Sequence, residues 1–236
     1  MTKALRAIWN VFVYLIGLLI IAVGINVSKR SALGISPVSS IPAVLSSILN
    51  VSLGSMVILV YVALVLAQLL VLRRRFQWKN ALGVPVALIF GMMVDFVGVS
   101  SFKLTLAGIP LGIETEFHGL MEFLPKPDGL LWQFVYLLAS ILIIGIGVFI
   151  YLRPKLVPMP AEGLAGAISQ VGKWKFGNCK TAVDFSLILI AAILQVILLG
   201  GFGTLWIGGA GPVGVGTVLA AVCVGQVVKL LNKAFK

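Results

Sequence analysis

Charged residues are scarce in this sequence. Only 11% of its 236 residues are charged and seven are acidic, whereas soluble domains carry about 25% charged residues. Hydrophobic residues make up 60% of the chain, and the mean hydropathy is +1.14. These values exclude a soluble domain and predict an integral membrane protein.

Histidine and cysteine are almost absent too. The single histidine, His118, lies in a less apolar stretch, and Cys179 and Cys223 show no metal-ligand spacing. No nucleophile is paired with a base, so we expect no enzyme, cofactor or metal site. The net charge of +11 does not indicate nucleic acid, because the lysines and arginines lie in short loops between apolar runs. The predicted partner is the lipid bilayer.

Two proline-containing segments interrupt the apolar runs. Residues 160–171 predict a helix with Pro160 in its first turn, about 18 Å long against a hydrocarbon core of about 30 Å. Residues 37–50 predict a second short helix, with Ser36 placed to cap it and Pro37 at its first position. We interpret both as half-helices that enter the membrane and return to the same face.

The two half-helices belong to an internal repeat. Pro37 and Pro160 are 123 residues apart (160 − 37), and the same offset relates further pairs without a gap. In so apolar a chain, a matched tryptophan, a matched arginine and two matched glycines are stronger evidence for a repeat than matched leucines. The pairs are Trp9 and Trp132, Gly24 and Gly147, Arg30 and Arg153, Ser46 and Ser169, and Gly54 and Gly177.

Six apolar runs predict membrane spans, at residues 9–27, 53–72, 81–97, 130–152, 181–199 and up to about 231. If both half-helices re-enter, the arginine cluster at residues 73–75 and both termini lie in the cytoplasm. This orientation follows the positive-inside rule, by which lysine and arginine collect in cytoplasmic loops, and only Lys29 and Arg30 break it. Repeat 1 covers residues 1–97, an external acidic loop residues 98–129, and repeat 2 residues 130–236. The predicted fold class is an all-α integral membrane protein with six transmembrane helices, two re-entrant half-helices and an inverted 3+3 repeat.

The predicted solute site lies where the half-helix N-termini meet at the midplane. Ser36, Ser39 and Ser40 would line one side, and Glu162 and Gly163 the other. Helix N-termini attract anions, although they could instead be satisfied by one another and by nearby serines. Glu162 is either a self-capping residue or a site for a proton, a cation or a substrate amine.

Further polar residues at membrane depth extend this site. Asp184 is a candidate proton or ion relay, and its alternative role is an ion pair with Lys180 one turn earlier. Asn26, Gln195 and Thr217 are candidate substrate-binding residues that could equally hydrogen-bond between helices.

Five segments resemble the YczE/YitT-type family of bacterial multipass membrane proteins. They are LGISP at 33–37, GMMVDF at 91–96, PAEGL at 160–164, the GN-x-K-x-x-x-D run at 177–184, and GVGT at 214–217. That family has repeated Gly-x-x-Pro segments followed by an acid, and Glu162 fits the acid position. Ser39 departs from the pattern, because relatives often carry aspartate there. The resemblance implies a protein of the bacterial cytoplasmic (inner) membrane and a transport role.

Together these features predict a secondary transporter of a small polar solute. The half-helix N-termini favour an anion and Glu162 a cation, so an anionic or a zwitterionic solute fits. The alternatives are an aquaporin-like passive channel and a non-transport membrane subunit that binds a solute or a protein. The candidate partners also include further copies of the same chain in a homo-oligomer.

Overall fold

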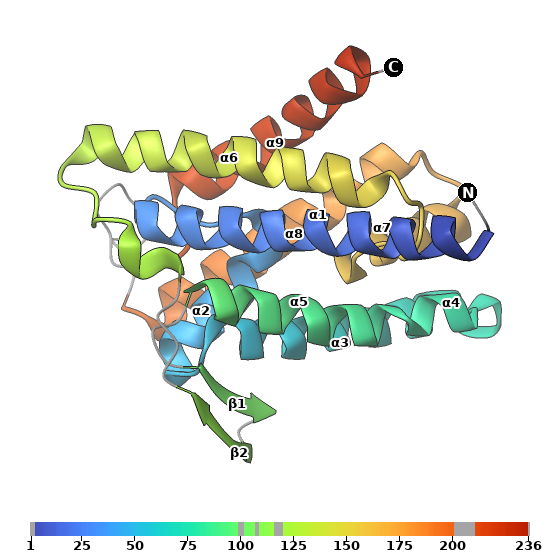
Figure 1. The fold of residues 1–236 in the computed structure, drawn as a ribbon, viewed down its shortest axis with the longest axis horizontal. Coiled ribbons are helices and arrows are strands. Elements are labelled where there is room, and N and C mark those ends of the chain that lie inside the picture. The colour runs from blue at the N-terminus through green and yellow to red at the C-terminus, as the bar shows by residue number, and fades with distance from the viewer. Residues whose placement is uncertain (1–2, 99–101, 107–108, 116–119, 201–210, 236) are drawn as a thin grey trace.

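Long apolar helices dominate the structure, a computed structural model that describes residues 3–98, 102–106, 109–115, 120–200 and 211–235 (Figure 1). Five of the described helices are long and apolar enough to cross a membrane. This confirms a multi-pass helical membrane protein. The five are α1 (Lys3–Ser31), α3 (Leu53–Leu72), α6 (Leu130–Leu152), α8 (Phe176–Leu198) and α9 (Val215–Ala234).

The predicted span at residues 81–97 is shorter in the structure than a full crossing. Helix α5 (Gly83–Gly98) has 16 residues, and a turn at Leu82 separates it from the short helix α4 (Trp78–Ala81). Gly83 and Pro85 suit a helix start rather than a helix interior, which explains the break.

Both proline segments form helices of 13 residues, α2 (Pro37–Leu49) and α7 (Pro160–Gly172). The residues at their N-caps have nearly the same backbone angles, φ −58° and ψ 149° at Ser36 and φ −58° and ψ 151° at Met159. Ser36 occupies the predicted cap position, but its side chain makes no capping hydrogen bond. The prediction of a serine cap was therefore wrong, and the proline alone marks the start of α2.

The backbone around α2 recurs around α7 with the 123-residue offset. Each helix ends at a residue in the left-handed region, Asn50 and Lys173. A serine in each helix donates its hydroxyl to a carbonyl five residues later at 2.7 Å, Ser46 to Val51 and Ser169 to Trp174.

Helices α1 and α6 cross in antiparallel directions at the centre of the fold (Figure 1). Glycines allow the close approach, because a Cβ built on Gly24 would lie 3.0 Å from the backbone nitrogen of Ile144. A Cβ on Gly147 would lie 2.9 Å from the nitrogen of Ile21, which repeats the same contact from the other helix.

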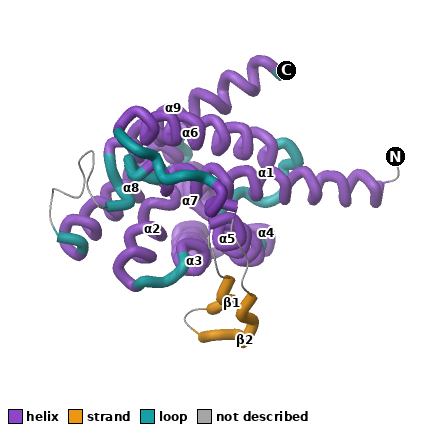
Figure 2. Tube along the Cα trace, turned by 60° about the vertical axis from the view of Figure 1, so that its left-hand side comes forward, coloured by secondary structure: helices purple, strands orange, loops and turns teal. Residues whose placement is uncertain are grey.

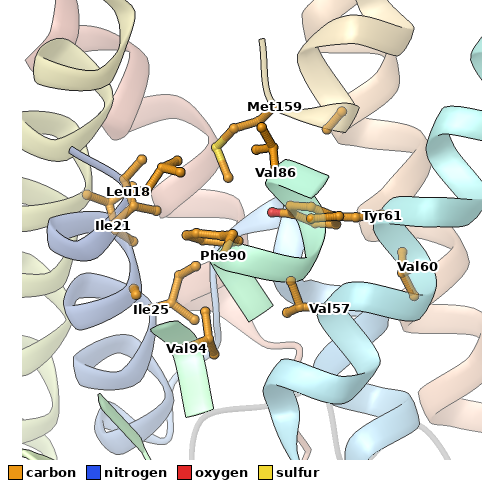
Figure 3. Packing of buried hydrophobic residues seen from close by; sticks show 14 of the residues in the cluster. Leu18, Ile21, Ile25, Val57, Val60, Tyr61, Val86, Phe90, Val94 and Met159 are labelled. Carbon is orange, nitrogen blue, oxygen red and sulfur yellow. The ribbon is translucent and has the colours of Figure 1, made fainter. Parts of the chain in front are cut away.

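The half-helices lie between the longer helices of both halves. Helix α2 packs on α3 and α8, and so does α7. The hydrophobic core beside them joins α1, α3, α5 and the segment before α7 (Figure 3). Tyr61 stacks on Phe90 there, with ring centroids 5.7 Å apart, and Met159 lies against the same cluster.

The segment predicted as an acidic loop at 98–129 contains a β-hairpin. Strand β1 (Phe102–Leu106) pairs antiparallel with β2 (Ile109–Thr115), and the hairpin projects from the helices (Figure 2). The short 3-10 helix η2 (Leu120–Phe123) follows. The expectation of an all-α chain is corrected here, since residues 102–106 alternate apolar and polar side chains as strands do.

Both chain termini lie at one end of the molecule, together with α4 (Figure 1). The arginine cluster precedes α4 as the 3-10 helix η1 (Arg73–Arg75), and none of its residues is buried. The hairpin and the C-terminal end of α1 lie toward the opposite end.

Candidate functional site

Glu162 lies in the first turn of α7, two residues after Pro160. The backbone amide of Met159, the N-cap residue, bonds to its carboxylate, which is one half of a capping box, because methionine has no hydroxyl for the reciprocal bond. The other carboxylate oxygen, Oε2, is buried and has no hydrogen-bond partner. Self-capping therefore uses only part of the hydrogen-bonding capacity of Glu162, and a buried acceptor is left unfilled.

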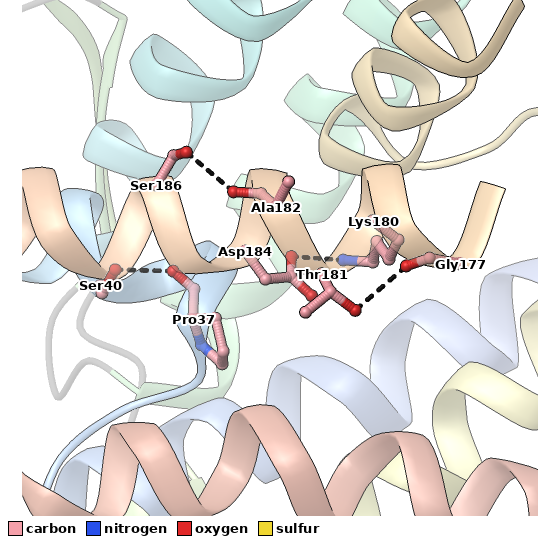
Figure 4. Close-up of polar contacts among 8 residues, drawn as sticks. All are labelled: Pro37, Ser40, Gly177, Lys180, Thr181, Ala182, Asp184 and Ser186. Carbon is pink, nitrogen blue, oxygen red and sulfur yellow. Dashed lines mark hydrogen bonds and ion pairs between the residues drawn. The ribbon is translucent and has the colours of Figure 1, made fainter. Parts of the chain in front are cut away.

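An ion pair on α8 lies near this carboxylate. Lys180 Nζ is 2.6 Å from Asp184 Oδ1, with the side chains 25% and 19% exposed (Figure 4). Both residues interact electrostatically with Glu162. The sequence left the role of Asp184 open between an ion pair and a relay, and the structure shows the ion pair beside Glu162.

Side chains of α1 and α3 hold the N-terminus of α7. Gln68 Nε2 donates to the carbonyl of Pro160 at 2.9 Å, and Tyr14 Oη donates to that of Val157, also at 2.9 Å. A Cβ built on Gly163 would lie 2.7 Å from Gln68 Oε1, so the glycine lets the amide reach the helix end. Tyr61 of α3 is buried and interacts electrostatically with Glu162.

The N-terminus of α2 lies against α8. Ser40 Oγ donates to the carbonyl of Pro37 at 2.6 Å and approaches the carbonyl of Leu187 at 3.4 Å (Figure 4). Leu187 follows Asp184 by three residues, which is about one helical turn. The N-termini of the two half-helices thus reach neighbouring turns of α8.

Ser39 is the counterpart of Glu162 at the 123-residue offset. It is fully buried, and its hydroxyl has no hydrogen-bond partner. Both half-helices therefore carry a buried polar atom without a partner at the same position of the first turn. Buried polar groups without partners are rare in proteins, and each calls for a partner such as a ligand, an ion or a water molecule.

Three of the predicted binding residues fix backbone segments elsewhere. Thr217 accepts from the amide of Ile35 at 3.2 Å, and Asn26 donates to the carbonyl of Val94 at 2.9 Å. Gln195 donates to the carbonyl of Val213 and accepts from its amide. These contacts tie helices and loops together, which is the alternative role that the sequence left open.

Two tyrosines near Glu162 were not predicted from the sequence. Tyr14 and Tyr61 lie within apolar runs, where the pattern predicts only packing in a membrane span. A tyrosine in the middle of a span brings a hydroxyl to membrane depth, and that signal could have found them.

Asp95 is a further buried acid, and it has a structural role. Its carboxylate accepts from the Ser52 hydroxyl and from the Gly54 amide, both at 2.6 Å, and so caps α3 from the neighbouring helix α5. Asp95 therefore differs from Glu162, because both of its oxygens have partners.

The sequence matches a family of unknown function, DUF6198, over residues 8–233. The chain belongs to this family. This DUF6198 chain is 26% identical over 215 residues to the uncharacterized protein YyaS of Bacillus subtilis (strain 168), which covers 90% of the chain and 86% of YyaS. No solved structure matches it significantly. Neither finding names the YczE/YitT-type family, so the resemblance to that family stays a prediction.

Proposed function

We propose that the protein is a secondary transporter of a small polar solute, with its site around Glu162 and Ser39. The observation that carries the proposal is the pair of buried polar atoms without partners, at equivalent positions of the two half-helices. A solute with hydrogen-bond donors would fill the Glu162 acceptor, and one with an acceptor would pair with the Ser39 hydroxyl.

The charges around the site favour a zwitterionic solute over a simple cation. The N-termini of α2 and α7 supply partial positive charge for a carboxylate, and Glu162 supplies a partner for an ammonium group. Asp184 is proposed as the ion or proton relay, because it lies near Glu162 and can exchange its partner Lys180. We propose no catalytic role for these residues.

We propose further that the fold is an inverted repeat with α4 and α5 together as the sixth crossing. The contacts between helices support this proposal. The α3–α7 contact in one half corresponds to the α8–α2 contact in the other. The α1–α5 contact corresponds in the same way to the α6–α9 contact. Alternating access would then come from rocking one half against the other.

The proposed membrane is the bacterial cytoplasmic membrane, with both termini in the cytoplasm. The position of the Arg73–Arg75 cluster at the same end as the termini supports this orientation, because cytoplasmic loops carry an excess of positive charge (Figure 1).

Thermal stabilisation by solutes tests the proposed site. Purified protein is heated with a panel of small anions, amines and amino-acid zwitterions, and wild type is compared with Glu162→Gln. A solute that binds only the folded protein increases the free energy of unfolding, by about 2.7 kcal/mol at a hundredfold excess over Kd, and therefore raises Tm. We expect a zwitterion to stabilise the wild type and to lose most of this effect in Glu162→Gln.

Gln170→Ala is the control, because Gln170 is a polar side chain of the same helix that is exposed eight residues beyond Glu162. It should respond to the solute as the wild type does. A solute that stabilises Glu162→Gln and wild type equally would place binding elsewhere and overturn the proposed site.

A further inference from the structure

A cavity of about 470 Å³ opens at the C-terminal end of α1, away from the chain termini. Its lining comes from α1, from the end of α5, from the segment before α6 and from the start of α6. Ligand pockets have volumes of about 300 to 1,000 Å³, so this space suits a small organic molecule. Its described lining residues include Asn26, Lys29, Arg30, Lys126 and Gln133.

Three of these residues are basic, and none of the described lining residues is acidic. Lys29 also lines a second cavity of about 210 Å³, which reaches Gly34 and Ile35 in the segment that leads into α2. The two cavities therefore meet around Lys29 and extend toward the first half-helix. Positive charge concentrated in such a concave space attracts anions.

The guanidinium of Arg30 is only partly used by the protein. Its Nη2 donates to the carbonyl of Leu124 at 2.6 Å, which positions the group, while its Nε is buried without a partner. A buried guanidinium donor without an acceptor is costly, and a carboxylate or phosphate oxygen would satisfy it.

Among the described residues, two acidic groups lie near the cavity. Asp95 interacts electrostatically with Lys29, but its oxygens are already hydrogen-bonded to Ser52 and Gly54. Asp128 is exposed beside the lining residue Pro127. Within the described part of the chain, neither of these carboxylates forms an ion pair with Arg30 or Lys126, so both cations can bind a ligand.

We propose that this cavity is an anion-binding vestibule, in which Lys29, Arg30 and Lys126 bind the carboxylate or phosphate group of a small molecule or of a lipid. An anion site would explain why Lys29 and Arg30 lie at the end of the molecule that is proposed to face away from the cytoplasm, where the positive-inside rule disfavours basic residues. It does not depend on the Glu162 site, so either proposal can fail without the other.

Titration of delipidated protein in neutral detergent with succinate and with inorganic phosphate tests the vestibule, with binding followed by Tm and by calorimetry. We expect saturable binding of at least one probe and an affinity about fivefold weaker in Lys126→Gln, because one charged contact is lost. Arg30→Lys, which keeps the charge but not the fork of donors, should weaken binding as well.

Lys233→Gln is the matched control, because it removes an exposed charge near the end of α9, at the other end of the molecule (Figure 1). It should bind the probes as the wild type does. Failure of both probes to bind wild type would overturn the proposal, and so would equal affinity of wild type and a Lys29→Gln/Lys126→Gln double variant.

Nanodiscs separate the two sources of the anion. If phosphatidylglycerol discs abolish succinate binding and phosphatidylcholine discs do not, a lipid headgroup occupies the vestibule. If succinate binds equally in both discs, the ligand is a free anion. Either result supports an anion site, provided that Lys126→Gln weakens binding.

Discussion

Among single residues, Gln68 has the clearest structural role near the candidate site. It is buried on α3, and its amide donates to the carbonyl of Pro160, where α7 begins. The contact joins two segments that are 92 positions apart in sequence. Gln68 therefore sets the position of the helix end that carries Glu162.

Gln68→Leu should destabilise the protein by about 1 to 2 kcal/mol, since the Pro160 carbonyl loses its donor in a buried setting. Denaturant unfolding in detergent would measure the change. Gln170→Leu is the control, because Gln170 is exposed on α7 and should leave stability nearly unchanged. Equal effects of the two variants would argue against a role for Gln68 in holding α7.

Residue chemistry could be predicted from the sequence only in part. The rarity of acids drew attention to Glu162 and Asp184, and the i, i+4 spacing indicated the Lys180 pair that the structure shows. Tyr14 and Gln68 could not be assigned to α7, because their contacts depend on how distant helices pack.

At the scale of elements, close helix crossings depend on glycine. Gly147 of α6 faces the backbone of α1 at Ile21, and Gly225 of α9 has open space around it. The two positions differ in packing although both glycines lie inside helices.

Gly147→Ala should cost about 1 to 3 kcal/mol of stability, because the added methyl forces α1 and α6 apart. Gly225→Ala should be neutral or stabilising by up to about 1 kcal/mol, since alanine favours the helix and meets no neighbour. Thermal unfolding in the same detergent compares them. A neutral Gly147→Ala would contradict the tight crossing.

Helix positions followed from apolar runs and prolines where those signals were strong. The runs at 53–72 and 130–152 correspond to α3 and α6. The start of α8 was predicted five residues late, at 181, because the lysines before it were interpreted as a loop. The repeat offset would have placed that start at Phe176, opposite Leu53 of α3.

For the whole molecule, the arrangement of half-helices links the fold to the proposed transport. Helices α2 and α7 both pack between α3 and α8, so movement of one half of the molecule would change the surroundings of Ser39 and Glu162 together. Neither of the two cavities described above is lined by Glu162. The sequence indicated the repeat through matched residues, but the convergence on α8 required the packed structure.

Solute flux into liposomes tests the transport proposal most directly. Protein is reconstituted with the solute that stabilises it most, and uptake of the labelled solute is measured for wild type and Glu162→Gln. We predict saturable uptake by wild type and at least a tenfold loss in Glu162→Gln, which corresponds to about 1.4 kcal/mol. Uptake by wild type no faster than in protein-free liposomes, or equal uptake by both proteins, would contradict a transporter centred on Glu162.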